Sequence, residues 1–293
     1  MHVEEAPGIE SSAPAPARAH PRQRTRAPAR ARTPSRSAAR QPAPRAPHLC
    51  TQMGKVRVRQ HVNPLRAEYL TPLGPIDWAA AFEDPGLPLV IDLGCGPGRF
   101  LLLLQRRAAA GGGGAGVAAG GRCNFLGVEI RRALVDRANQ WAADLGVKGR
   151  VHYVFTNATI SLATMLQGYP GEVQAFYVQF PDPHFKKKHK KRRLLQPDTV
   201  RAMAGVLRPG GVVFLQSDIL QAAEGMRDAV ESAAADCFEL APAHADPAAA
   251  PFASAWAAGG WLRDNPVGTP TEREHYVTET QDGAIYRVLL LRK

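Results

Sequence analysis

The sequence has few cysteines and no long apolar run. Its four cysteines, Cys50, Cys95, Cys123 and Cys237, are scattered and no two are spaced as C-x-x-C. Neither a disulfide framework nor a zinc site is therefore expected, and a reducing intracellular compartment fits this pattern. No histidine, cysteine and acid cluster points to another metal. No stretch of 18 apolar residues occurs, so we expect no membrane span.

Residues 11–48 contain no acidic residue at all and consist mainly of Ala, Pro, Arg and Ser. Frequent prolines interrupt helices and strands and little can be buried, so we expect residues 1–50 to be a disordered tail. Such a composition is typical of an organellar transit peptide. Its proline content favours the chloroplast over the mitochondrion. Three acidic residues near the N-terminus weigh against a transit peptide. The alternative is a plain disordered tail on a cytoplasmic or nuclear protein.

The charge balance is strongly basic, with a net charge of +11 and a sequence pI of about 9.9. Part of this charge belongs to the nine arginines of residues 1–50, and much of the rest lies in the basic run of residues 186–193. A balance of this kind favours a polyanionic partner.

The whole chain is 293 residues long and 45% hydrophobic. After the tail, strand-like and helix-like segments alternate along it. The spacing at which apolar residues recur distinguishes predicted strands from predicted helices. Their alternation predicts an α/β fold with a mostly parallel sheet. Ligands of such sheets bind beyond the carboxyl ends of the strands. The predicted strands are 87–93, 124–129, 151–155, 173–180, 211–217 and 285–291, and the clearest helices are 133–145 and 197–207. Two low-complexity stretches, 108–121 and 241–265, are predicted to be flexible insertions.

A glycine-rich turn follows the first predicted strand. It contains Asp92, Gly94, Gly96 and Gly98 in the pattern D-x-G-x-G-x-G. A dinucleotide fingerprint would need a further glycine at Arg99, so that interpretation fails. An ordinary strand-to-helix turn remains the alternative. The pattern resembles the first motif of class I S-adenosylmethionine-dependent methyltransferases, in which the loop passes beneath the methionine part of the cofactor.

Two later strand ends carry residues suited to a nucleoside. Glu129 lies 31 residues after Gly98, and removing the 14-residue insertion 108–121 leaves 17. This is close to the spacing of about 20 at which an acid accepts ribose hydroxyls. A solvated acid before a helix is the alternative. Asn157, in the sequence Thr-Asn-Ala after the third strand, could meet the adenine edge or simply cap the next helix.

The sequence FPDPHFKKKHKKRR begins at Phe180 and follows the fourth predicted strand. Prolines on both sides restrict the backbone of Asp182, which suits a carboxylate that must hold a base in place. The basic run that follows could be a solvated loop. Its position directly after a carboxylate that faces the cofactor favours a phosphate-binding strip, which would hold RNA without reading its sequence.

This segment resembles the signature of the tRNA (guanine-N7-)-methyltransferase family. Other stretches agree in order, and the resemblance covers about residues 55–293. The discriminating parts are FPDP with its basic tail and the C-terminal T-x-x-E element, because the strand motifs are shared by all class I methyltransferases. The further matching stretches are RVRQHVNPL (57–65), IDLGCGPG, GVEIRRALVDRA, LRPGGVVFLQSD (207–218) and TEREHY (271–276).

The resemblance implies a doubly wound, Rossmann-like sheet of seven strands with helices on both faces. It implies transfer of a methyl group from S-adenosylmethionine to N7 of a guanosine in the tRNA variable loop. It places the catalytic acid at Asp182. The implied cofactor contacts are Asp92, Gly94, Gly96, Gly98, Glu129, Ile130, Asn157, Ala158 and Gln179. The implied substrate contacts are Lys186, Asp218, Thr271, Glu272, Arg273 and Glu274.

The chain departs from many bacterial members at two positions, where Asn157 replaces an acid and His184 a tryptophan. Neither change removes a reacting group. Some eukaryotic members need a β-propeller partner, but bacterial and organellar types are expected to act alone, so no protein partner is required by the sequence. The alternatives are a class I methyltransferase for another RNA base or a metabolite, and a non-catalytic RNA-binding subunit.

Overall fold

The computed structural model describes residues 61–244 and 256–293, which belong to one unit, Gly54–Lys293. Three sequence predictions lie wholly or partly outside the described residues. They are the tail of residues 1–50, the start of the stretch 57–65, and residues 245–255 of the second predicted insertion.

A seven-stranded sheet forms the centre of the described part of the chain, in the order β3-β2-β1-β4-β5-β7-β6. Every pairing among β1 to β5 is parallel, whereas β7 runs antiparallel to both β5 and β6. The strand order reverses between β1 and β4, so a switch point lies there. The predicted doubly wound α/β fold is thereby confirmed. The strands are β1 (Leu89–Leu93), β2 (Asn124–Glu129), β3 (Val151–Phe155), β4 (Val173–Gln179), β5 (Leu207–Ser217), β6 (Phe238–Leu240) and β7 (Tyr286–Arg292).

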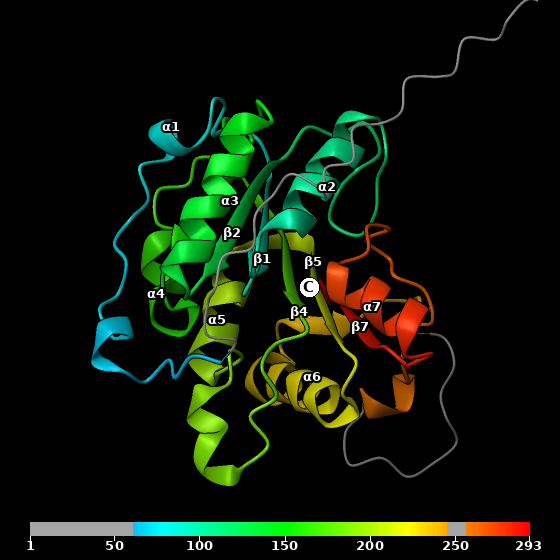
Figure 1. The fold of residues 1–293 in the computed structure, drawn as a ribbon. Helices are drawn as coiled ribbons and strands as arrows, with labels where there is room; N and C mark the ends of the chain where they lie inside the picture. The colour runs from blue at the N-terminus through cyan, green and yellow to red at the C-terminus, as the bar shows by residue number, and fades with distance from the viewer. Residues whose placement is uncertain (1–60, 245–255) are drawn as a thin grey trace, which may run out of the picture. The chain divides into compact units, whose positions relative to one another are not determined.

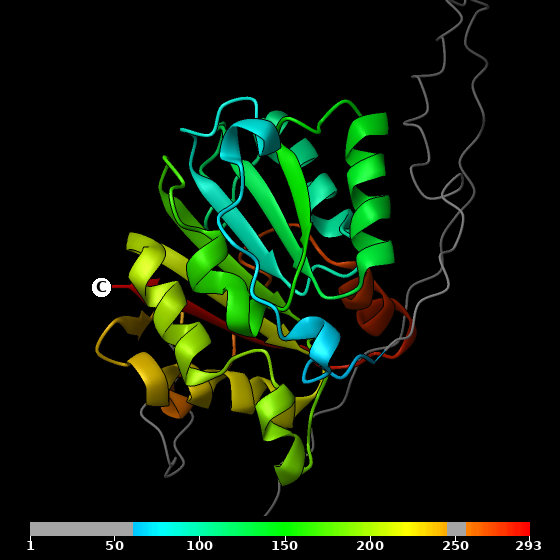
Figure 2. The same ribbon diagram turned by 90° about the vertical axis from the view of Figure 1, so that its left-hand side faces the viewer.

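Helices cover both faces of the sheet (Figures 1 and 2). One face carries α2 (Arg99–Ala109), α3 (Arg132–Asp144) and α7 (Glu272–Thr280). The other carries α1 (Trp78–Ala81), α4 (Ala158–Met165), α5 (Pro197–Val206) and α6 (Leu220–Ala234). In the connections of the described residues lie the short 3-10 helices η1 (Ala67–Tyr69), η2 (Lys187–Arg192) and η3 (Ala257–Gly259).

The strands are apolar almost throughout because neither face of the sheet meets water. All five residues of β1 are buried. Successive side chains point to opposite faces, so Leu89, Ile91 and Leu93 join the core beneath α4 and α5. Asp92 points to the other face, beneath α2 and α3. The one polar residue of β1 therefore lies near its carboxyl end, beside the switch point.

The glycine-rich insertion packs on the sheet, which differs from the predicted flexible surface loop. Tyr177 Oη donates to the carbonyl of Ala115 at 2.5 Å, and Gln174 Nε2 donates to that of Gly116 at 2.6 Å. A Cβ atom on Gly116 would lie 2.4 Å from that of Ala175. Val117 is buried. Ala115 and Gly116 have a small side chain or none, so the backbone of the insertion can lie directly on β4 and β5. It covers the part of this face of the sheet that α2 leaves open.

Candidate active site

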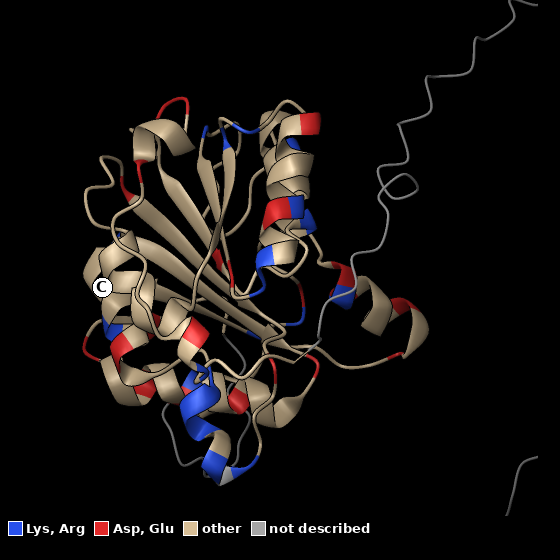
Figure 3. Ribbon diagram, turned by 60° about the vertical axis from the view of Figure 1, so that its left-hand side comes forward, with Lys and Arg blue, Asp and Glu red and all other residues tan. Residues whose placement is uncertain are grey.

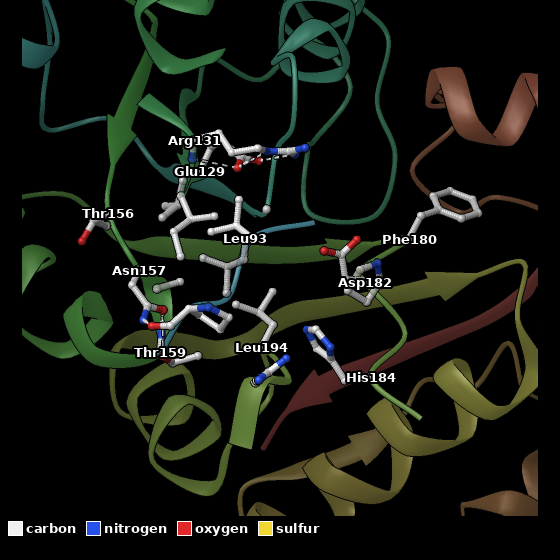
Figure 4. Close-up of a pocket in the computed structure, with 18 residues that line it drawn as sticks. Leu93, Glu129, Arg131, Thr156, Asn157, Thr159, Phe180, Asp182, His184 and Leu194 are labelled. Carbon is white, nitrogen blue, oxygen red and sulfur yellow. Dashed lines mark hydrogen bonds and ion pairs between the residues drawn. The ribbon is translucent and has the colours of Figure 1, made fainter. Parts of the chain in front are cut away.

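A cavity of about 160 Å³ lies at the carboxyl ends of β1 to β4, beside the switch point (Figure 4). The predicted cofactor residues Gly94, Glu129, Ile130, Asn157 and Ala158 line it together with Asp182. Strand ends that are far apart in the sequence thus meet at one edge of the sheet, as the fold requires. The remaining lining residues are Val62, Pro64, Leu93, Val128, Arg131, Thr156, Thr159, Phe180, Pro181, His184, Arg192 and Leu194.

The glycine loop turns sharply between β1 and α2. Gly94, Gly96 and Gly98 have φ values of 80°, 54° and 80°, in the left-handed region that glycine tolerates. A Cβ atom on Gly98 would lie 2.6 Å from the ring of Tyr153, so no other residue fits there. At Gly94, by contrast, no atom lies within 4 Å of the place of a Cβ. The loop is therefore packed below Gly98 and open above Gly94, where a ligand can approach the backbone.

Asp92 is a buried carboxyl group beneath this loop. Gln179 Nε2, at the end of β4, donates to its Oδ1 at 3.4 Å. Burial raises the pKa of Asp92 to about 7; the hydrogen bond from Gln179 lowers it and the charge of Glu129 raises it further. Its protonation state therefore depends on what binds nearby.

Glu129 is only 3% exposed, so it is not the solvated acid of the alternative interpretation. Its carboxylate accepts hydrogen bonds from the backbone N–H of Gly96 at 2.9 Å and of Arg131 at 3.0 Å. The Arg131 side chain adds two more, from Nε at 2.8 Å and from Nη2 at 3.0 Å, and Figure 4 shows the pair. This fixes the carboxylate directly beside the glycine loop.

Arg131 is a site residue that the sequence reasoning missed, although it lies in the matching stretch GVEIRRALVDRA. Burial disfavours its charged form, but the hydrogen bonds and charge of Glu129, with the charge of Asp182, raise the pKa of Arg131 overall. Glu129, predicted to bind the cofactor, and Asp182, predicted to be the catalytic acid, therefore act on the same guanidinium.

Asn157 caps α4, as one interpretation of the sequence expected. Its Oδ1 accepts from Thr159 N at 3.1 Å. Its Nδ2 donates to the carbonyls of Pro64 at 3.2 Å and Tyr69 at 3.3 Å. Asn157 therefore holds the segment of residues 61–69 against the cavity, and it still lines the cavity where an adenine contact was predicted.

Asp182 lies at the mouth of the cavity, and its side chain is 40% exposed. Phe180, two residues earlier, has φ 49°, which is rare outside glycine and marks a strained exit from β4. His61 Nδ1 lies 3.1 Å from Asp182 Oδ1. His61 belongs to the matching stretch 57–65, but nothing in that stretch alone indicated this contact.

Most of the basic run forms η2, where Figure 3 shows Lys and Arg positions gathered along one short stretch of the ribbon. Lys186 precedes this helix and is exposed, and it is not among the residues that line the cavity. Arg192 lines the cavity instead. Arg193 donates to the carbonyl of His184 through Nε and Nη2, both at 3.2 Å, so it holds the loop that follows Asp182.

The remaining predicted substrate residues lie together where β5 ends and α7 begins. Asp218 accepts hydrogen bonds from Arg273, and Glu272 pairs with Arg99 of α2. Thr271 caps α7 by accepting from the N–H of Glu274. These contacts are all within the chain, so the structure brings this set together without showing a substrate role.

Glu274 is the one predicted substrate residue of this group that is buried, and its contact with the substrate stays a prediction. Its carboxylate accepts from Arg287 Nη2 at 2.8 Å and from Asn265 Nδ2 at 2.8 Å. A side chain in this position cannot reach an RNA without leaving its ion pair.

Within residues 61–244 and 256–293, no helix is both long and apolar enough to cross a membrane. The same residues contain no group of three or more His, Cys, Asp or Glu side chains that could hold a metal ion.

The site fits a nucleoside cofactor with a charged amino-acid part. Glu129 offers a fixed carboxylate for hydroxyl groups, Ile130 and Ala158 offer apolar surface, and Gly94 leaves the backbone accessible. With the strand order and the D-x-G-x-G-x-G loop, these features define a class I S-adenosylmethionine-dependent methyltransferase.

Comparison with known proteins identifies the family. Residues 87–252 match the family described as "Putative methyltransferase". The tRNA (guanine-N(7)-)-methyltransferase of Trichormus variabilis is 40% identical over 238 residues, covering 81% of this chain and 96% of its own. That of a Synechococcus strain is 42% identical over 237 residues, covering 81% and 85%. The chain belongs to the tRNA (guanine-N(7)-)-methyltransferase family.

Solved structures are more distant. An rRNA methylase from Streptococcus thermophilus aligns with 71% of this chain and 87% of its own, at a TM-score of 0.39 and 11% identity.

Proposed function

We propose that this protein transfers a methyl group from S-adenosylmethionine to N7 of a guanosine in the variable loop of tRNA. The observation that carries the proposal is the position of Asp182. It borders the same cavity as Gly94 and Glu129, and it opens the segment that continues into the basic run. The relatives reported above, whose names state methylation of guanine N7 in tRNA, support the same reaction.

S-adenosylmethionine, when bound, supplies an electrophilic methyl group on a positively charged sulfur. Glu129 would hold the ribose hydroxyls, and Ile130 and Ala158 the base. Asp92 and Gln179, which are hydrogen-bonded to each other and do not line the cavity itself, would act on the methionine part from beneath the glycine loop. The cavity walls formed by Leu93 and Val128 exclude water from one side.

Guanine N7 carries an in-plane lone pair, so it needs no deprotonation before it attacks a methyl group. The chain must therefore mainly align acceptor and donor. The Asp182 carboxylate can accept hydrogen bonds from the N–H groups of the guanine edge, which fixes the base. As positive charge develops on the purine, the same carboxylate stabilises it. No proton needs to leave before the methyl group transfers.

The basic run supplies the second half of substrate binding. Lys188, Lys190 and Lys191 of η2 are exposed, and the helix contains no acid that would neutralise them. Contacts of Lys and Arg with phosphates position a nucleic acid without specifying its sequence. Specificity for guanosine would then come from the base contacts at Asp182.

The deciding experiment incubates the purified chain with unmodified tRNA and S-adenosylmethionine, followed by nucleoside analysis. We expect N7-methylguanosine, and its loss when the substrate tRNA carries adenosine at the variable-loop position. A different methylated nucleoside would identify another RNA-base methyltransferase. No product together with tRNA binding and no cofactor binding would identify a non-catalytic RNA-binding subunit. Full turnover by the chain alone would also support our proposal that no protein partner is required.

We further propose that residues 1–50 direct the protein to the chloroplast. The Arg-, Pro- and Ser-rich composition, without acids in residues 11–48, supports an address. Fusing residues 1–50 to a fluorescent protein tests it. We expect fluorescence in plastids. Fluorescence in mitochondria would show that the segment directs proteins to that organelle instead, and fluorescence in the cytoplasm or nucleus would contradict a targeting role.

A further inference from the structure

A continuous chain of polar side chains, buried except for the half-buried Gln179, links α7 to the carboxyl group beneath the glycine loop. It runs from Glu274 and Arg287 through Gln216 and Gln179 to Asp92. Gln216 Nε2 lies 2.8 Å from Gln179 Oε1, and Gln179 Nε2 lies 3.4 Å from Asp92 Oδ1. The linked residues come from α7, β7, β5, β4 and β1, so the chain crosses four strands of the sheet.

The direction of each hydrogen bond follows from the two charged residues at one end. Arg287 can only donate and an ionised Glu274 can only accept. Gln216 touches both, with Oε1 3.3 Å from Arg287 Nε and Nε2 3.3 Å from Glu274 Oε2. Its carbonyl must therefore face the arginine and its amide nitrogen the glutamate. No other orientation of Gln216 satisfies both partners.

The orientation of Gln216 in turn dictates that of Gln179. Because Gln216 presents an N–H, Gln179 must turn its carbonyl oxygen toward it. The Gln179 amide nitrogen then faces Asp92. The ion pair cannot reorient easily, because Arg287 Nη1 also donates to the carbonyl of Arg263 at 2.6 Å, and Asn265 also donates to Glu274.

We propose that Glu274 and Arg287 are positioning residues of the cofactor site, which act through Gln216 and Gln179 to keep an N–H donor directed at the Asp92 carboxylate. The inference rests on the proposed function only in assigning Asp92 to the cofactor site. It gives Glu274 a role other than the predicted contact with tRNA.

The consequence concerns the charge beneath the cofactor. An N–H donor favours the ionised form of Asp92, whereas a carbonyl oxygen in its place would favour the protonated form. The cofactor is a cation at its sulfur, so the ionised form is the one that attracts it. The other titratable groups that act electrostatically with Asp92 are Glu129, Cys95, Tyr153 and Tyr177. None of them donates a hydrogen bond to Asp92 among the described residues, so the Gln179 amide is the group that can be switched.

The test measures S-adenosylmethionine affinity by calorimetry between pH 5.5 and 9 in the absence of tRNA. Affinity of the wild type should rise with pH as Asp92 ionises, since burial raises the pKa of Asp92 to about 7. The midpoint of this change is the pH at which affinity has reached half of its highest value. In Gln216→Met, which frees the Gln179 amide, the midpoint should move up by about one pH unit. Affinity at pH 7 should then fall about fivefold, because a smaller fraction is binding-competent, and recover near pH 9.

Glu274→Gln should move the midpoint in the same direction, while Glu279→Gln should leave it unchanged. Glu279 lies on the same helix but is exposed, so it controls for the loss of a charge on α7. Should Gln216→Met fail to fold, Gln179→Met removes the donor directly at a less buried position. Its midpoint should also rise.

A lowered melting temperature with an unchanged midpoint would show that the network is only structural and would overturn the proposal. Weaker tRNA binding by Glu274→Gln, with the cofactor midpoint unchanged, would return Glu274 to a substrate role. If the wild type bound no cofactor, the pH dependence of unfolding by urea would report the same shift of Asp92. A shifted midpoint without N7-methylguanosine formation would refute the proposed function and leave this inference standing.

Discussion

The two acids at the centre of the site lie in opposite surroundings. Glu129 is 3% exposed and accepts hydrogen bonds from Gly96 and from Arg131. The side chain of Asp182 is 40% exposed, and its carboxylate pairs with the exposed His61. The cofactor side is therefore built in advance, whereas the RNA side is left open for the substrate to complete. Fixed donors cost no reorganisation on binding, and an open edge admits a bulky nucleic acid.

The largest effect should come from the open side. Asp182→Ala should lower kcat about 10²–10³-fold, because it removes a preorganised charge from the transition state. Cofactor affinity, measured by calorimetry, should change little. If Asp182→Ala instead lowered cofactor affinity and kept the wild-type kcat, Asp182 would belong to the cofactor side of the site and the comparison would be wrong.

On the closed side, Asp92→Asn should change how stability depends on pH. Burial raises the pKa of Asp92 to about 7 from 3.8, so the native state holds a proton that the unfolded state has released. The contribution of Asp92 to the free energy of unfolding should fall as pH rises from about 4 to about 7, by roughly 4 kcal/mol at most. Urea unfolding of both proteins over this pH range gives the free energy of unfolding at each pH. Its decrease with rising pH should be smaller in the variant than in the wild type. Parallel curves would show that Asp92 titrates normally.

Glu129→Ala should weaken cofactor binding about 10–100-fold, since hydrogen bonds to a charged group contribute about 1.5–3 kcal/mol. It should also reduce stability, because Arg131 is left partly buried without its acid. Filter binding of tRNA without cofactor should match the wild type. Glu68→Ala is a matched control, an exposed acid outside the cavity lining. An unchanged cofactor affinity would remove Glu129 from the site.

Changes in the basic run should have smaller, additive effects on tRNA binding. Neutralising Lys188, Lys190 and Lys191 should reduce the magnitude of the slope of log affinity against log salt, by about 0.7 to 0.9 for each phosphate that is no longer neutralised. Cofactor binding should not respond. Arg193 must be kept, because it holds the carbonyl of His184. Lys148→Gln, outside η2, controls for net charge. A variant with the parent's affinity and salt slope would show the run to be a solvated loop.

The smallest effect separates two residues of the same run. Arg192 lines the cavity and Lys186 does not, so Arg192→Gln should reduce kcat a few-fold while Lys186→Gln mainly raises KM for tRNA. A larger loss of kcat in Lys186→Gln would show that Lys186, which the family resemblance implies is a substrate contact, also acts in the chemical step.

Most of the fold was predictable from local patterns. Strands 124–129 and 151–155 have the same bounds as β2 and β3, because both faces are buried and each apolar run ends at a polar or turn residue. The three-residue strand β6 was missed, since so short a run carries little periodicity. The packing of the insertion was also missed, because it depends on Gln174 and Tyr177, which lie 58 and 62 residues from their partners.

The site was predictable only in part, for the same reason. Strand ends marked Asp92, Glu129 and Asp182, and the fold brings them to one edge. The contact of His61 with Asp182 joins distant parts of the sequence, and that of Glu274 with Gln216 spans 58 residues. Contacts of this length are set by tertiary packing, and no local pattern around either residue signals them. His61 was therefore unnoticed, and the burial of Glu274 in an ion pair was not foreseen, while its predicted contact with the substrate stays a prediction.

The hold of Asn157 on the segment of residues 61–69 sets a limit on trimming of the chain. Val62 and Pro64 form part of the cavity wall, and His61 reaches Asp182. If the proposed address is removed by a peptidase, the cut would have to fall before His61, because a later cut would remove part of the cavity wall. The proposed address and the active site would then share one boundary in the chain, which the cavity wall sets.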